Sequence, residues 1–172
     1  SGTVTDAATG NPLPGAVLRV SQNNEVLDTA TAGGDGRYTF PELPGGSYSV
    51  AATAPGHLRS TREDILVVPG QETTLVFSLS ELLARGEMRI VLSWGEQPSD
   101  LDSHLWIPEE FAYHLYYSRT GGLEQCPFAN LDVDDTDSFG PETVTIGQRL
   151  QTGKYVYAVY NYSGSPDLTT SE

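Results

Sequence analysis

Turn-forming residues interrupt this 172-residue chain at short intervals, and their spacing limits the elements that it can form. Many of its 18 glycines and 11 prolines separate short segments of apolar or alternating character. In the first half these segments occupy residues 2–5, 16–22, 37–40, 48–54, 65–68 and 73–79. Short strands separated by turn signals every roughly 8–12 residues are typical of a β-sandwich. We therefore expect an all-β fold, with a first sandwich in residues 1–80.

The rest of the chain is predicted to form a second β-sandwich. Residues 81–86 (ELLARG) form a short linker in which helix-forming residues indicate one helical turn. Residues 87–172 resume the strand pattern, at 88–94, 101–107, 113–118, 129–133, 142–146 and 154–162. The last segment has apolar groups on both faces, which predicts a central strand covered on both sides.

In the first domain, residues 33–36 (GGDG) predict a tight hairpin turn.

Residues 1–80 resemble the carboxypeptidase regulatory-like modules. The resemblance rests on residues 9–16 (TGNPLPGA), 35–40 (DGRYTF), 43–48 (LPGGSY) and 54–56 (APG), together with the opening strand. It implies a transthyretin-like, or Ig-like, sandwich that acts as a spacer or accessory to other domains. Some related sandwiches carry an isopeptide crosslink from a lysine. Because Lys154 is the first lysine of the chain, the first domain cannot form one.

The second half resembles an uncharacterised bacterial surface-protein family. The matching blocks are residues 88–95 (MRIVLSWG), 98–105 (PSDLDSHL), 131–136 (LDVDDT) and 140–143 (GPET). The resemblance implies an extracellular or cell-surface location and a domain that continues through further strands. We therefore expect an incomplete second sandwich with an open sheet edge, through which two copies can associate.

Two acidic segments indicate a cation site in the second domain. Alternate residues of a strand project to one face, which would pair two carboxylates in each segment. Two unit charges about 4 Å apart repel by roughly 4 kcal/mol at an effective dielectric near 20, so converging pairs need a cation, arginines or full exposure to water. We favour a cation, and calcium in particular. Calcium binds six to eight oxygens, and the segments lack the glycine and glutamate positions of an EF-hand. The predicted calcium ligands are Asp100, Asp102, Asp132, Asp134 and Asp135, with Glu142 as a lesser candidate.

Other uses of these polar residues are also compatible with the sequence. Aspartates also cap turns and accept backbone hydrogen bonds. His104 follows Asp102 on the same strand face, a spacing that suits either a zinc ligand or a histidine paired with a carboxylate. His57 and His114 have no partner at an informative spacing. Aromatic side chains offer either a sandwich core or a sugar-stacking platform, with Trp106 and Phe111 flanking one loop.

Composition excludes several classes of function. A net charge of −14 disfavours nucleic acid as a partner. No apolar run reaches the roughly 20 residues of a membrane helix, so we expect no membrane insertion. Cys126 is the single cysteine, so no disulfide forms within the chain. No nucleophile elbow, phosphate loop or zinc-protease helix is present, which predicts that the chain is not an enzyme.

Together these features predict a non-catalytic, calcium-stabilised binding or adhesion module of a secreted or cell-surface protein. Its expected partner is a protein or a glycan. Two alternatives belong to other classes: a purely structural spacer, and an accessory part of a carbohydrate-active enzyme, in which two carboxylates would sit at a fixed separation.

Overall fold

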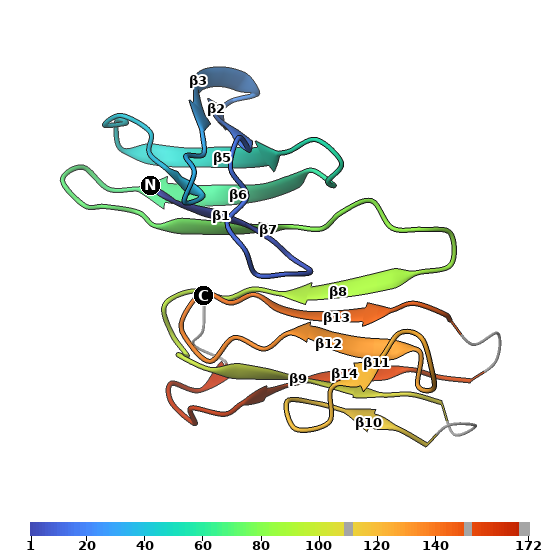
Figure 1. Cartoon of the computed structure of the whole chain (residues 1–172). Helices are drawn as coiled ribbons and strands as arrows, with labels where there is room; N and C mark the ends of the chain where they lie inside the picture. The colour runs from blue at the N-terminus through green and yellow to red at the C-terminus, as the bar shows by residue number, and fades with distance from the viewer. Residues whose placement is uncertain (109–111, 150–152, 169–172) are drawn as a thin grey trace. The chain divides into compact units, whose positions relative to one another are not determined.

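The computed structural model describes residues 1–108, 112–149 and 153–168, and its regular elements are all strands (Figure 1). The chain divides into two compact units. Unit 1 comprises residues 1–6 and 10–82, and unit 2 comprises residues 7–9 and 83–172. The predicted all-β class is confirmed. No helix in the described residues has the length and apolar character of a membrane span.

Unit 1 is a sandwich of two sheets. One sheet has the order β3 (Glu25–Thr31), β2 (Val17–Gln22), β5 (Gly46–Thr53) and β6 (Ser60–Val67). The other has the order β4 (Arg37–Tyr38), β1 (Gly2–Asp6) and β7 (Leu75–Leu79). Alternate side chains of both sheets are buried, as in β5, where Tyr48, Val50 and Ala52 point inward. They form one core with Val4, Phe77 and Leu79 of the opposite sheet.

The parallel pairing of β1 with β7 determines where one polar group of unit 1 lies. Asp6 is opposite Leu79 in this register. The buried residues of β1 are Val4 and Asp6, and those of β7 are Phe77 and Leu79. Asp6 is thus a carboxylate at the end of a row of core-facing side chains.

Two local predictions for unit 1 and the following linker were wrong, and one strand was not predicted. Residues 33–36 do form a turn, closed by the bond from the Gly36 N–H to the Gly33 carbonyl at 3.0 Å, but they do not join a hairpin. They connect β3 of one sheet to β4 of the other. Strand β3 itself lacks a clean apolar alternation and was not predicted. The expected helical turn at residues 81–86 is absent, because Glu81 instead pairs with His57 in a β-bridge.

Unit 2 is also a sandwich of two sheets. Its four-stranded sheet has the order β11 (Gly121–Gly122), β12 (Ala129–Val133), β13 (Glu142–Ile146) and β8 (Met88–Leu92). Its three-stranded sheet has the order β10 (His114–Leu115), β9 (Leu101–Trp106) and β14 (Val156–Asn161). The core between them contains Leu105 and Leu115 from one sheet, and Leu131, Val144 and Ile146 from the other.

Strand β14 is not central, contrary to the sequence prediction. It pairs only with β9 among the described strands and lies at the edge of its sheet. Its burial alternates, so that Val156 and Tyr160 are 43% and 58% exposed while Tyr157 and Val159 are partly buried. The apolar groups on its outer face are therefore surface side chains. They do not indicate a second covering layer.

Candidate metal centre

Glu142 lies at the end of the core of unit 2. In β13, Val144 and Ile146 face the core, and Glu142 continues the same row because side chains alternate along a strand. Its side chain is only 1% exposed. One of its carboxylate oxygens, Oε2, accepts a hydrogen bond from the backbone N–H of Ser103 in β9, on the opposite sheet. Glu142 therefore bridges the two sheets at this end of the sandwich.

Two aspartates meet Glu142 at this position. Asp102 in β9 is 4% exposed, and Asp134 directly follows β12 at the surface. One carboxylate oxygen from each of the three residues lies within 4.8 Å of the others. The group thus combines two buried carboxylates with one that faces solvent, so an ion could enter from the side of Asp134.

Three carboxylate oxygens of this region are buried without a hydrogen-bond partner in the described part of the chain. They are Oε1 of Glu142, Oδ2 of Asp102 and Oδ1 of Asp100. Leaving a buried polar atom unpaired costs about 1–3 kcal/mol, and more when the group is charged. A bound cation, a proton or an ordered water molecule can satisfy these oxygens.

The carboxylates of this group raise one another's pKa values. Burial, followed by the charges of Asp100 and Asp134, raises the pKa of Asp102 to about 6. Burial is also the main cause that raises the pKa of Glu142, and the neighbouring Asp134 adds to it, while the bond from Ser103 opposes it. The pKa of Asp100 is raised by burial and then by Asp134 and Asp137. Without a cation, these raised pKa values favour the protonated form of some members of the group.

Four of the five predicted ligands belong to this electrostatic group. Asp100 and Asp135 each interact with Asp134, and burial followed by neighbouring carboxylates raises the pKa of Asp135. The backbone N–H of Asp137 donates to Asp135 Oδ1 at 2.8 Å, so that carboxylate also shapes the loop. Glu142, the lesser candidate from the sequence, belongs to the group of three carboxylates with Asp102 and Asp134, whereas Asp135 does not.

The fifth predicted ligand, Asp132, has other partners. Its carboxylate accepts hydrogen bonds from Asn130 Nδ2 at 3.0 Å and from the hydroxyl of Thr145. The pairing of β12 with β13 shifts register between Leu131 and Val133, so Asp132 sits in a β-bulge. A bulge breaks the alternation of side chains, and Asp134 consequently does not share the surroundings of Asp132.

His104 pairs with another histidine, outside the carboxylate group. Its Nδ1 lies 2.9 Å from Nε2 of His114, so one ring donates and the other accepts. The rings of Trp106 and His114 stack with centroids 4.2 Å apart, and Tyr116 stacks on the other side of His114 at 4.7 Å. Phe111, predicted to accompany Trp106, lies outside the described residues. The result is an aromatic ladder along the outer face of β9 and β10.

Part of the aromatic surface around this ladder is open to solvent. Trp106 is 40% exposed, and Tyr160 on the edge strand β14 is 58% exposed. Tyr160 also contacts the ring of His104, with centroids 6.0 Å apart. Tyr117 and Tyr162 extend the aromatic surface, and their rings are 5.9 Å apart. We use "aromatic face" below for Trp106, His104, His114, Tyr116, Tyr117, Tyr160 and Tyr162.

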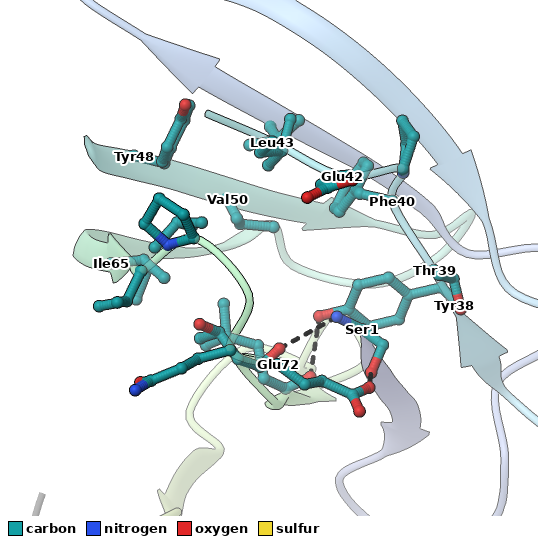
Figure 2. Close-up of a pocket in the computed structure, with 18 of the residues that line it drawn as sticks. Ser1, Tyr38, Thr39, Phe40, Glu42, Leu43, Tyr48, Val50, Ile65 and Glu72 are labelled. Atoms are coloured by element: carbon teal, nitrogen blue, oxygen red, sulfur yellow. Dashed lines mark hydrogen bonds between the residues drawn. The ribbon is translucent and has the colours of Figure 1, made fainter. Parts of the chain in front are cut away.

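A cavity of about 190 Å³ opens at one end of unit 1 (Figure 2). Its lining is largely apolar and includes Phe40, Leu43 and Val50. The hydroxyls of Tyr38 and Tyr48 each donate to a backbone carbonyl, of Leu75 at 2.8 Å and of Pro44 at 2.7 Å. These hydroxyls already serve the fold, and the polar groups that remain in the lining include Glu42 and Glu72 (Figure 2).

Comparisons with known proteins agree with the sequence resemblance for the first domain. Residues 1–80 match the family model of the carboxypeptidase regulatory-like domain. Among solved structures, the Bacillus anthracis TIE protein aligns with 92% of this chain at 18% identity and a TM-score of 0.40. The alignment covers 27% of that protein, so this chain spans about a quarter of its length.

Proposed function

We propose that this chain, whose first 80 residues are a carboxypeptidase regulatory-like domain, is a non-catalytic part of a larger extracellular or cell-surface protein. In this proposal unit 2 is a binding module whose loops are ordered by Ca²⁺. The proposed ligands are Asp102, Asp134 and Glu142, with Asp100 and Asp135 completing the site. Asp132, the remaining residue of the sequence-predicted set, is proposed only to support the fold of β12.

The observation that carries the calcium proposal is Glu142. It is almost fully buried, its Oε1 has no hydrogen-bond partner among the described residues, and it lies against Asp102 and Asp134. A buried carboxylate needs a counter-charge or a proton. The donors are all oxygens and come from three separate segments, which suits the large and flexible coordination sphere of Ca²⁺. Water on the exposed side, beside Asp134, would supply the remaining ligands.

Melting experiments with and without calcium test this proposal. A ligand that binds only the folded state at about 100 times its Kd stabilises it by about 2.7 kcal/mol. Both tryptophans of the chain, Trp94 and Trp106, lie in unit 2, so intrinsic fluorescence follows the unfolding of that unit. We expect excess EDTA to lower the melting temperature of unit 2 and added Ca²⁺ to restore it. An identical melt in EDTA and in Ca²⁺ would contradict the proposal.

The aromatic face supports a binding role for unit 2. Exposed tryptophan and tyrosine rings present flat apolar surfaces with polar edges, which suit the faces of sugar rings. With a net charge of −14, the chain favours a neutral glycan over an acidic one. We therefore propose a neutral glycan as the ligand. Glycan-array binding that Trp106→Ala abolishes would support this role, whereas a chain that binds no glycan in Ca²⁺ or EDTA would be a spacer.

A further inference from the structure

A second polar group lies in unit 1 and involves a histidine for which the sequence suggested no partner. His57 follows the turn between β5 and β6 and forms an isolated β-bridge with Glu81, just beyond β7. Asp6 ends β1 and is opposite Leu79 of β7. Glu81 lies two residues beyond Leu79, and its exposed side chain comes close to those of Asp6 and His57. The three side chains thus converge at one end of the core.

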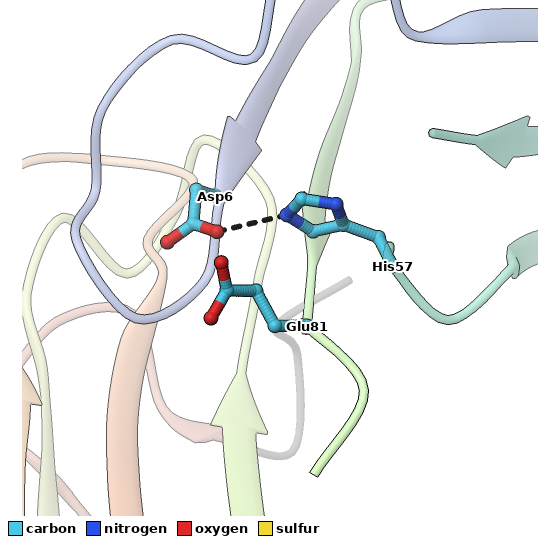
Figure 3. A group of neighbouring side chains, drawn as sticks. All are labelled: Asp6, His57 and Glu81. Atoms are coloured by element: carbon cyan, nitrogen blue, oxygen red, sulfur yellow. Dashed lines mark hydrogen bonds and ion pairs between the residues drawn. The ribbon is translucent and has the colours of Figure 1, made fainter. Parts of the chain in front are cut away.

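The geometry of the group is well defined (Figure 3). His57 Nε2 lies 2.9 Å from Asp6 Oδ2, and one ligand atom from each of Asp6, His57 and Glu81 lies within 4.8 Å of the others. The other ring nitrogen, Nδ1, lies 2.9 Å from the carbonyl oxygen of Pro55. A carbonyl can only accept, so Nδ1 carries a proton. In the neutral ring, Nε2 therefore presents a lone pair to the carboxylates.

This arrangement of a histidine is common in metal sites. There, one ring nitrogen typically donates to a backbone carbonyl or carboxylate, which fixes the tautomer and aims the other nitrogen at the metal. A lone pair on Nε2 facing Asp6 is repulsive unless a proton or a cation lies between them. Two carboxylates with an imidazolium sum to a charge of −1, whereas two carboxylates and a neutral imidazole exactly balance a divalent cation.

The same surroundings also favour a proton on His57. Burial lowers the pKa of His57, but the bond to Pro55 and the carboxylates of Asp6 and Glu81 outweigh it, so the pKa is raised overall. The side chain of Glu81 is exposed, which leaves the group accessible to ions from solvent. Proton and metal thus compete for one position, and a metal of high imidazole affinity is needed to displace the proton.

We infer that Asp6, His57 and Glu81 form a binding site for a divalent transition-metal cation such as Zn²⁺, separate from the calcium site proposed for unit 2. One imidazole nitrogen and two carboxylate oxygens suit Zn²⁺, with water as the fourth ligand, and suit Ca²⁺ poorly because calcium prefers oxygen alone. The bound ion would tie together the end of β1, the turn before β6 and the segment after β7. The site is independent of the proposed adhesion function.

Titration of the whole chain with Zn²⁺ in the presence of excess Ca²⁺ tests this inference. Calcium occupies an oxygen-only site, so binding of Zn²⁺ reports sites with nitrogen ligands. We expect one Zn²⁺ per chain, with binding lost in His57→Gln and in Asp6→Asn. His114→Gln is the matched control, because the chain has only three histidines and the other two lie in unit 2. Binding that persists in His57→Gln, or that His114→Gln removes, would overturn the inference.

A second measurement covers the case in which a variant fails to fold. Nitrogen-15 NMR of the wild-type imidazoles distinguishes a protonated Nε2 from a metal-bound one. We expect Zn²⁺ to shift the Nε2 resonance of His57 and to leave its Nδ1 proton in place. A His57 ring that keeps both protons and does not respond to Zn²⁺ would show that the group is an ion pair only, and the inference would be wrong.

Discussion

Substitution of Glu142 by glutamine should have opposite effects in the presence and absence of calcium. Glutamine keeps the shape of the side chain and an oxygen that accepts from the N–H of Ser103, but it removes one negative charge. In Ca²⁺ the variant loses a charged ligand. In EDTA the substitution removes the charge repulsion between residue 142 and the carboxylates of Asp102 and Asp134. The two effects have opposite signs because the same charge is attractive to the ion and repulsive to its neighbours.

The magnitudes follow from the geometry. Two unit charges 4.8 Å apart repel by about 3.5 kcal/mol at an effective dielectric near 20. Solvent beside the exposed Asp134 reduces this value, so we expect Glu142→Gln to stabilise unit 2 by about 1–3 kcal/mol in EDTA at alkaline pH. At calcium concentrations about 100 times Kd, the wild type gains about 2.7 kcal/mol from the ion, most of which the variant lacks.

Urea unfolding followed by tryptophan fluorescence measures the free energy of unfolding of unit 2 in EDTA and in Ca²⁺. The stability order of wild type and variant should reverse between EDTA and Ca²⁺. Glu124→Gln is the matched control, since Glu124 is an exposed glutamate of the same unit and should change little in either condition. Equal destabilisation by Glu142→Gln in both conditions would show that Glu142 is only a structural hydrogen-bond acceptor, and the calcium proposal would be wrong.

Four further outcomes are expected. Asp132→Asn should leave the calcium response intact and destabilise unit 2 by about 1 kcal/mol, because it weakens the bond from Thr145; loss of the calcium response in thermal melts would contradict this. In EDTA, the stability of unit 2 should fall as pH rises through about 6 and then about 8, because burial raises the pKa of Asp102 to about 6 and that of Glu142 to about 8, and each proton is lost in turn. Ca²⁺ should remove this fall, and a melting temperature that rises with pH in EDTA would contradict the prediction. Tyr160→Ala should weaken glycan binding without changing the calcium response, and equal glycan affinity of wild type and variant would count against the aromatic face. Sedimentation should show concentration-dependent dimers through β14, which Val159→Pro disrupts; a wild-type chain that stays monomeric at all concentrations would exclude this association.

The sequence predicted the strands of the fold more accurately than it predicted the contacts between side chains. Strands with clean alternation, such as β2, β5, β12 and β13, were located to within one or two residues. Strand β3 was missed because its side chains are mostly exposed and show no apolar period. The prediction that β14 is a central strand was wrong. Apolar residues on both of its faces suggested two covering layers, whereas its outer face carries exposed aromatic rings.

The candidate site was also only partly predictable from the sequence. That Asp102 and Asp134 meet could be anticipated, since both lie in short acidic blocks at the ends of predicted strands. The bulge at Asp132 could not be anticipated, because it depends on the register of β12 against β13. The contact between Asp6 and His57, 51 residues apart, depends on the parallel pairing of β1 with β7, which has no local signal in the sequence.

Calorimetric titration of the chelator-treated chain with Ca²⁺ measures directly whether the carboxylate group of unit 2 binds the ion. We expect one Ca²⁺ bound per chain in the wild type and none in Glu142→Gln under the same conditions. A wild-type chain that binds no Ca²⁺, or a Glu142→Gln variant that binds it with unchanged affinity, would contradict the account.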